Sequence, residues 1–452
     1  MARIGLVLTF ALVLSLGFSQ ASVGEAQGAR TVVIGGLDNP RGLTFGPDGK
    51  LYVAEAGTGG DQQTAWVPPF QSAKIGTSGR ILKIDGGQSS VVASGLQSIA
   101  LGPANEMVGP QNVVFLGQTL YALVGQMNAL PTGTQTFSLL VKVGADGKAE
   151  TVADLGKYER DNDPDGTVPD SNPFGLAAGP DGNLYVTDAG GNDLLKVTPS
   201  GEVSTVAVWK DNPVPTAVAF DSSGRAHVGF LSPNPFAAGS ARVERVTGSS
   251  SEVLVPGLMT VVDIKFGPDG SLYILEHTGE RIMGPPPSFK ENSGRVLKVS
   301  SSGLQEIAGG LNHPTKMAFG PDGALYVANN AVAPTPKVGE ILKLTLPATG
   351  TPVTPAPVAQ ASPAAQPSPA AKPAAPAAAP AAAPAAQPSP AAKPAAQAPA
   401  QAPAAKPAAV PSPAALPRTG VGPDIASGLV PVAAAGAALA TVGIGLLRRR
   451  RR

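Results

Sequence analysis

A short recurring motif constrains the fold of this chain more than any other feature. Four near-identical segments combine a GPDG sequence with a following LYV or LYI: Leu43–Gly57, Leu176–Gly190, Ile264–Gly279 and Met317–Asn330. Two degenerate copies stand between them, at Val113–Gly125 and Val218–Phe230. Proline suits the second position of a tight turn and glycine suits a left-handed position, so each copy predicts a β-hairpin. A repeat of this length indicates an architecture built from similar β-units.

Each hairpin is followed by a third predicted strand of similar pattern. These strands are Gly79–Asp85, Ser138–Gly144, Asp193–Pro199, Ala241–Thr247, Gly294–Ser300 and Gly339–Thr345. A fourth strand follows in the first five units but not in the sixth, whereas a strand of that type, Thr31–Leu37, precedes the first unit. The sequence therefore predicts an all-β, six-bladed propeller over residues 31–346, closed by the N-terminal strand. An open array of hairpins would leave that strand unexplained.

The amino-acid sequence of the repeats resembles one family in particular. The stretches GLDNPRGLTFGPDGKLYVAEAGTGG, TSGRILKIDGG and DSNPFGLAAGPDGNLYVTDAGGNDLLKV are similar to the ScyD/ScyE family of exported propellers, within the wider group of NHL-type and lactonase-like repeats. The resemblance runs from about Thr31 to Leu346. It implies a propeller fold and an exported setting, and it brings no assigned reaction.

The N-terminus predicts export. Residues 1–29 combine Arg3, an apolar run from Ile4 to Phe18 and small residues further on, which is typical of a secretory signal peptide. The apolar run is short for a membrane span, which favours cleavage over an uncleaved anchor.

The C-terminal third predicts a stalk and an anchor. Residues 347–415 are almost wholly Pro, Ala, Gln, Ser, Thr and Val, a composition that favours an extended, disordered spacer. Residues 416–452 hold an LPXTG-type sequence, an apolar stretch long enough for a transmembrane helix, and five terminal arginines. This order resembles the sorting signal of sortase substrates, which implies cell-wall anchoring through a cell-envelope amine. The alternative is a membrane tail anchor. The residues of the motif are Leu416, Pro417, Arg418, Thr419 and Gly420.

Charge and cysteine content exclude some functions. Residues 1–30 carry a net charge of +1, and the residues from Pro347 onward carry +8. Because the whole chain carries +1, the predicted propeller between them carries a net charge of −8. Such an acidic globular part speaks against nucleic acid as a partner. The chain has 0 Cys, so an exported fold must depend on its core or on bound ions.

The predicted strand order places the function at one end of the propeller. Long connections cluster where first strands begin and second strands end, and insertions confined to one face mark a binding face for an extracellular ligand, glycan or protein. The polar candidates on that face are Arg41, Glu55, Gln111, Asn112, Asn172, Asp188, Asp263, Glu276, His313 and Asn329. Several of them are expected to cap loops instead of touching ligand.

Two further interpretations concern chemistry. No catalytic motif was recognised, yet related lactonase-like propellers hold a divalent cation, for which Glu55, Asn112, Asn172, Asp188 and Asp263 are suitable residue types; a metal-dependent lactonase or lyase is the alternative to a binding module. Separately, the DNDPDG segment places Asp161, Asp163 and Asp165 at the spacing of a calcium loop. It departs from the EF-hand pattern at position twelve, Asn172, and the competing interpretation is a solvated acidic loop.

Overall fold

A computed structural model describes residues 29–64, 73–101, 106–126, 137–233, 235–280, 289–332, 335–347 and 351–352. All of them belong to one compact unit, and a second unit, residues 361–432, lies wholly outside the described residues. The predicted signal peptide is outside them except for its last residue. The sorting motif, the apolar stretch after it and nearly all of the predicted stalk lie outside as well.

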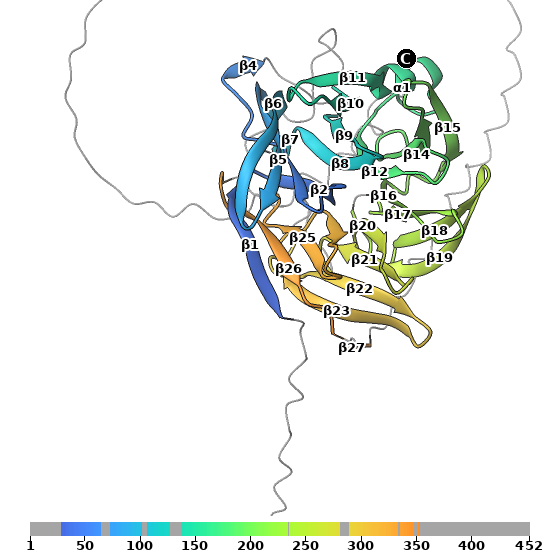
Figure 1. Ribbon diagram of the computed structural model, residues 1–452. Coiled ribbons are helices and arrows are strands. Elements are labelled where there is room, and N and C mark those ends of the chain that lie inside the picture. Colours follow the sequence, from blue (N-terminus) through green and yellow to red (C-terminus); the bar gives the residue numbers. More distant parts are fainter. Residues whose placement is uncertain are drawn as a thin grey trace, which may run out of the picture. The chain divides into compact units, whose positions relative to one another are not determined.

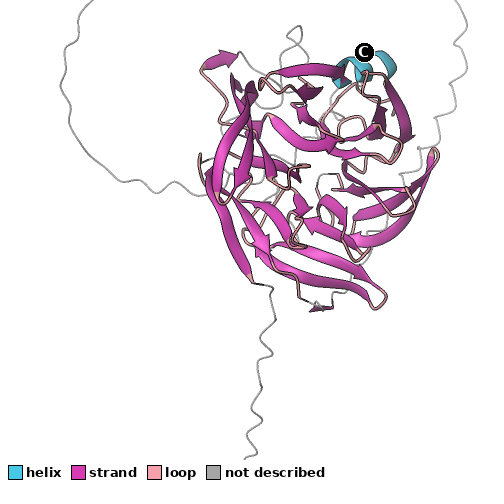
Figure 2. Cartoon of the chain, in the orientation of Figure 1, coloured by secondary structure: helices cyan, strands magenta, loops and turns pink. Residues whose placement is uncertain are grey.

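Six separate antiparallel sheets make up the described part, one for each predicted repeat (Figures 1 and 2). Blade one contains β2 (Pro40–Phe45), β3 (Leu51–Glu55), β4 (Gln62–Thr64), β5 (Ala73–Asp85), β6 (Gln88–Leu101) and β7 (Glu106–Val108). Blade two contains β8 (Pro110–Leu116), β9 (Thr119–Val124), β10 (Leu139–Val143) and β11 (Ala149–Asp154). Blade three contains β12 (Pro173–Ala178), β13 (Leu184–Asp188), β14 (Asp193–Val197) and β15 (Val203–Val208).

The second half repeats this order. Blade four contains β16 (Pro215–Phe220), β17 (Ala226–Phe230), β18 (Ala241–Thr247) and β19 (Ser250–Leu258). Blade five contains β20 (Val261–Phe266), β21 (Leu272–Glu276), β22 (Gly294–Ser300), β23 (Gly303–Leu311) and the short β27 (Thr351–Pro352). Blade six contains β24 (Met317–Phe319), β25 (Leu325–Asn329), β26 (Gly339–Leu344) and, from the other end of the chain, β1 (Arg30–Leu37).

The ring closes as the sequence predicts. Strand β1 pairs antiparallel with β26, with Arg30 opposite Leu344 and Leu37 opposite Gly339, and so supplies the outer strand of blade six. The first strands of neighbouring blades contact one another around a complete circle: β2, β8, β12, β16, β20, β24 and back to β2. Those labelled in Figure 1 (β2, β8, β12, β16 and β20) surround the centre. The prediction of a six-bladed, all-β propeller closed by its N-terminal strand is confirmed.

The structure differs from the predicted strands in several places. The short strands β4, β7 and β27 were not predicted, and β27 lies within the predicted stalk. Strands β5 and β6 of blade one extend well beyond the predicted residues 79–95 and pair from Ala73–Leu101 to Asp85–Gln88. The connection after β11, expected as a plain loop, begins with the helix α1 (Leu155–Asn162). Asp154 caps this helix by accepting a hydrogen bond from the Lys157 N–H at 2.7 Å, a preference of aspartate at helix N-termini.

The end of the propeller that carries the GPDG turns is called the turn face. Here the second-strand tyrosine of one blade meets the first-strand phenylalanine of the next, edge to face, with ring centroids 4.9 Å apart. The pairs are Tyr52–Phe115, Tyr185–Phe220, Tyr273–Phe319 and Tyr326–Phe45, and His227 takes the tyrosine position against Phe266 at 5.0 Å. These contacts tie neighbouring blades together, which explains why the motif repeats.

Both glycines of a GPDG turn are required, for different reasons. A Cβ at Gly267, the first glycine of its turn, would lie 2.4 Å from Cε2 of Tyr273. The second glycine, Gly270, has a φ of +75° and open space around it, so its requirement is the left-handed backbone alone.

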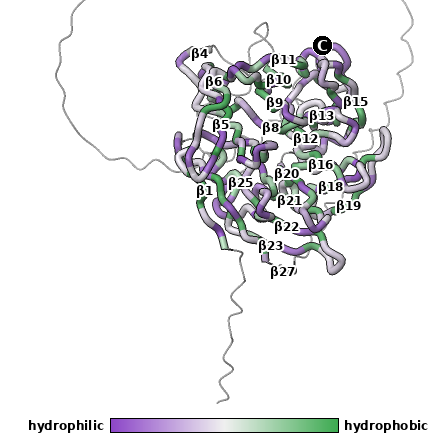
Figure 3. Tube along the Cα trace, viewed as in Figure 1, coloured by the Kyte–Doolittle hydropathy of each residue, from purple (hydrophilic) through white to green (hydrophobic). Residues whose placement is uncertain are grey.

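Hydrophobic stretches follow the strands around the ring (Figure 3), and buried Leu, Ile and Val side chains fill the spaces between adjacent sheets. Across the described ranges, no helix is long and apolar enough to cross a membrane.

Candidate functional site

The opposite end of the propeller, where first strands begin and second strands end, is called the loop face. Four sequence-predicted residues end second strands here and cap the preceding loops. Their side-chain oxygens accept backbone N–H groups at 2.6–2.7 Å: Glu55 from Asp38, Asp188 from Asn172, Glu276 from Met259 and Asn329 from Asn312. The hydrogen bonds fix the loops that enter each first strand, so these side chains have a structural role.

The capping side chains have further internal partners. Arg80 pairs with Glu55, Arg295 Nε lies 2.6 Å from Glu276 Oε2, and Asn329 donates to Glu340 at 2.7 Å. Glu55 and Glu276 are 0% exposed. Burial raises the pKa of Glu276, and the charge of Arg295 opposes that rise. These residues hold the loop face together from within.

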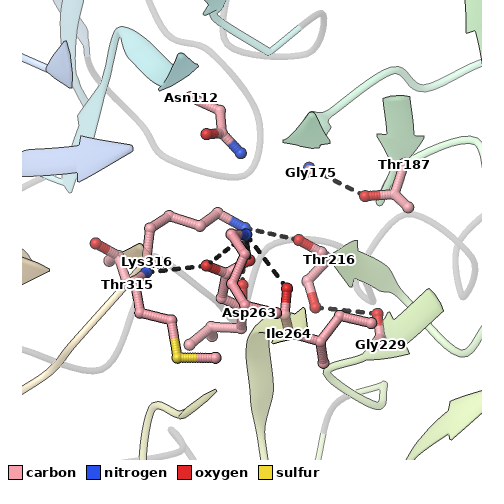
Figure 4. Close-up of polar contacts among 12 residues, drawn as sticks. Asn112, Gly175, Thr187, Thr216, Gly229, Asp263, Ile264, Thr315 and Lys316 are labelled. Atoms are coloured by element: carbon pink, nitrogen blue, oxygen red, sulfur yellow. Dashed lines mark hydrogen bonds and ion pairs between the residues drawn. The ribbon is translucent and has the colours of Figure 1, made fainter. Parts of the chain in front are cut away.

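The channel is crossed by a lysine that the sequence analysis missed. Lys316 is buried, and its Nζ donates to the carbonyl oxygens of Thr216 at 2.8 Å and Val262 at 2.7 Å, in two other blades (Figure 4). The ammonium also lies 4.3 Å from the ring centroid of Phe174. Burial lowers the pKa of Lys316 to about 7, while Asp263 opposes that fall.

Two predicted residues lie beside this lysine. Asp263 Oδ1 is 4.0 Å from Lys316 Nζ, and its carboxylate accepts from Lys265 at 2.7 Å and from the Met317 N–H at 2.9 Å. Asn112 donates to the Phe174 carbonyl at 3.2 Å. The channel interior therefore contains a layer of polar side chains that hydrogen-bond between blades. Lys316 occupies the same register position as the following residues of the other first strands: Gly42, Asn112, Gly175, Ala217 and Asp263. An alignment of the repeats could therefore have revealed the lysine.

At the loop-face mouth, Arg41 and His313 gather with His277. Arg41 is 4% exposed and donates from Nη2 to the Met107 carbonyl at 2.7 Å, while its Nε–H has no partner. The rings of His277 and His313 stack with centroids 5.1 Å apart, and neither Nε2 has a partner. Burial lowers the pKa of Arg41 to about 10.

Both imidazoles are neutral acceptors at neutral pH. Burial, the neighbouring His313 and the charge of Arg41 lower the pKa of His277 to about 3. Its Nδ1 lies 3.0 Å from the Pro314 carbonyl oxygen, which can only accept, so Nδ1 carries the proton and Nε2 keeps its lone pair. Burial lowers the pKa of His313 as well, and that residue hydrogen-bonds the backbone of Phe289.

Two more predicted residues lie near the starts of first strands. Gln111 is buried next to Asn112, and Asn172, which precedes Pro173, keeps a buried Oδ1 without a partner.

The predicted calcium loop has a different set of acids from the one expected. Asp161 and Asn162 belong to the last turn of α1, and Asp161 is exposed and pairs with Lys157 one turn earlier. Glu159 instead points inward and joins Asp163 and Asp165. In the described part of the chain, this is the one trio of acids and histidines whose ligand atoms all lie within 4.8 Å of one another, and it can hold a metal ion. Burial and neighbouring carboxylates raise the pKa of Glu159 to about 8.

The channel candidates proposed for a lactonase-like cation form no such trio. Glu55, Asp188 and Asp263 each accept internal hydrogen bonds, and none belongs to the group of acids around Glu159, Asp163 and Asp165.

Comparisons with known proteins add no family. No family model and no curated protein matches the chain. An oxidoreductase from Thermus thermophilus described as a glucose dehydrogenase aligns at 17% identity over 70% of this chain and 100% of its own, with a TM-score of 0.47. The PQQ-bound aldose sugar dehydrogenase of Streptomyces coelicolor aligns at 15% identity over 71% and 99%, with a TM-score of 0.44. A streptogramin B lyase aligns at 14% over 71% and 98%, with a TM-score of 0.41. Likenesses this low assign neither a family nor an activity, so the similarity to ScyD/ScyE stays a resemblance of motifs.

Proposed function

We propose that this protein is a binding module displayed on the cell surface, with a glycan as its ligand at the loop-face mouth of the channel. The proposal depends on where buried polar atoms lack hydrogen-bond partners. Within the described residues such atoms occur on the loop face and not on the turn face. At the mouth of the channel they belong to Arg41, His277 and His313. Because a buried polar group without a partner costs free energy, this concentration favours a ligand on that face.

The chemistry of the mouth fits hydroxyl groups. The acceptor nitrogens of His277 and His313 and the N–H donor of Arg41 are buried, so a sugar hydroxyl reaches them only when neighbouring side chains move. It would then donate to the histidines and accept from the arginine.

Display on the surface completes the proposal. The predicted signal peptide and the LPRTG sequence, residues 416–420, would place the propeller outside the cell, attached by sortase to a cell-envelope amine through a stalk of residues 347–415. Replacing Thr419 with Ala should abolish release of an envelope-linked species by wall digestion. Equal release from both forms would leave a tail-anchored protein instead. Calcium is the cofactor we propose for this module.

The binding proposal is tested on a glycan array with the purified full chain, followed by calorimetry with any glycan that binds. Substituting His313→Asn, which tolerates the residue's φ of +44°, should weaken binding about tenfold, the effect of losing one good hydrogen bond. The matched control is His227→Tyr on the turn face, which restores the residue found in other blades and should bind normally. An array without a bound glycan, or equal losses in both variants, contradicts the proposal.

A further inference from the structure

One position of the repeat differs in blade three from every neighbour. The last residue of each second strand lies opposite one residue of the third strand, and the identity of that pair varies from blade to blade. Blades one and five place a glutamate opposite an arginine there, Glu55–Arg80 and Glu276–Arg295. Blade four stacks Arg242 on Phe230, with 4.9 Å between the guanidinium carbon and the ring centroid.

Blade three instead places two acids opposite each other, Asp188 and Asp193. Asp188 is satisfied: it accepts N–H groups of Asn172, Gly190 and Gly191 and the hydroxyl of Ser171. Asp193 is 0% exposed, and neither of its carboxylate oxygens has a hydrogen-bond partner. Burying a carboxylate without a partner is costly, so the arrangement calls for a cation where blades one and five have arginine.

The strand geometry shows where Asp193 points. Residues two apart in a strand share a face, so Asp193 lies on the same side of β14 as Leu195. Leu195 packs in one hydrophobic cluster with Leu155 of α1, the helix that carries Glu159. Asp193 therefore faces the side of the blade from which α1 brings its acids.

The turn between β13 and β14 meets those acids directly. A Cβ at Gly191 would lie 2.9 Å from Oε2 of Glu159, so glycine leaves room for that carboxylate. Asn192 donates to Asp165 Oδ2 at 3.0 Å and joins the two segments. Ion pairs with lysine or arginine are absent, in the described part of the chain, from Glu159, Asp163, Asp165, Asp188 and Asp193.

We propose that Asp193 and Glu159, with Asp163 and Asp165, bind a calcium ion that takes the place of the arginine found in blades one and five. The donors are all carboxylate oxygens. Such oxygens suit hard cations such as calcium better than they suit zinc or copper. Calcium accepts irregular sets of six to eight oxygens, whereas magnesium demands a near-ideal octahedron and retains water. The ion joins α1 to the turn of blade three and fixes the long connection after blade two.

This inference rests on the proposed function in one respect only: it assumes that the propeller works outside the cell, where free calcium is abundant. Metal binding is measured without any glycan, so the two proposals fail separately.

The test uses the purified full chain after treatment with EGTA. Isothermal calorimetry with calcium chloride should show one site, and calcium at about a hundred times its dissociation constant should raise the melting temperature by on the order of 5 °C. Magnesium at the same concentration should give less than half of that shift.

Two variants locate the ion. Asp193→Asn should reduce calcium affinity at least tenfold, whereas the control Asp161→Asn, which changes an exposed acid on α1, should bind like the parent. Asp193→Arg recreates the pair of blades one and five, so it should lose the calcium-dependent shift in melting temperature without falling below the calcium-free parent.

Three outcomes would overturn the proposal: no calcium shift in the parent, a full shift in Asp193→Asn, or a stronger response to magnesium than to calcium. If Asp193→Asn does not fold, Glu159→Gln replaces it with the same expected tenfold loss.

Discussion

The two faces of the propeller use the same residue types in opposite ways. On the turn face each GPDG aspartate accepts the N–H two residues on and the hydroxyl of a tyrosine, as Asp269 does from Ser271 at 3.1 Å and Tyr273 at 3.2 Å. These groups are partly exposed, and the arrangement recurs from blade to blade. On the loop face the aspartates and histidines are buried, differ from blade to blade and leave atoms without partners. The comparison indicates that the repeated contacts of the turn face support the fold, whereas the residues that we propose for binding differ from blade to blade.

The largest expected effect separates an aspartate of each face. Asp188→Ala should cost about 3 kcal/mol of unfolding free energy, because three backbone N–H groups and one hydroxyl lose their acceptor in the interior. Asp181→Ala, in the GPDG turn of the same blade, should cost about 1 kcal/mol because water can replace the lost bonds. Asp188, a binding-face candidate from the sequence, is 1% exposed. Urea unfolding measures both, and equal midpoints would break the comparison.

A second effect depends on pH. The pKa of His277 is lowered to about 3 in the folded state, while the unfolded chain has an ordinary value of 6.5. Between these values the unfolded state binds more protons, so stability falls as the pH drops below 6.5. From pH 6.5 to 5 the loss should be about 2 kcal/mol from this residue. His277→Gln should remove that part of the pH dependence, measured by urea unfolding at both pH values; an unchanged slope would contradict it.

A smaller effect is expected in the turn. Gly267→Ala should cost about 1.5 kcal/mol, because the added methyl group meets the ring of Tyr273 at 2.4 Å and Phe319 at 3.1 Å. Ligand binding on the loop face should be unchanged. Thermal unfolding together with calorimetry checks both, and a loss of affinity at full folding would show that the faces are coupled.

The smallest effect concerns a surface ion pair. Lys298→Ala removes an ion pair with Asp269 at 2.7 Å and a contact with Tyr273, both partly exposed. The expected change is about 0.5 kcal/mol or less, typical of exposed pairs. A loss several times larger would mean that the turn face depends on its charges.

The repeat made the fold predictable, whereas the site was only partly so. Six hairpins and one displaced strand were enough to predict the closure of β1 on β26, because a period in the sequence maps directly onto blades. The sequence also indicated the end of the ring at which Arg41 and His313 lie, since both are next to a proline that recurs near the starts of first strands.

What the sequence could not show depends on contacts between blades. Lys316 reaches carbonyl groups more than fifty residues away, and only the closed ring brings them within range. The helix α1 was missed because its eight residues lack a strong apolar pattern, and with it the inward turn of Glu159 and the outward turn of Asp161. Asp193 could have been found by aligning the repeats, where an acid replaces the arginine of blades one and five.

The position of β26 between β1 and β25 has a mechanical consequence if the propeller is tethered through the residues that follow it. A pull on a tether attached after Pro352 first reaches the short pairing of β27 with β23, and then acts along β26, which is hydrogen-bonded on both edges. Such a load must break the hydrogen bonds on both edges of β26 at the same time. It cannot break the bonds of a single edge one after another. A surface protein held in flowing water by this end would therefore resist extraction best at the very strand that bears the force.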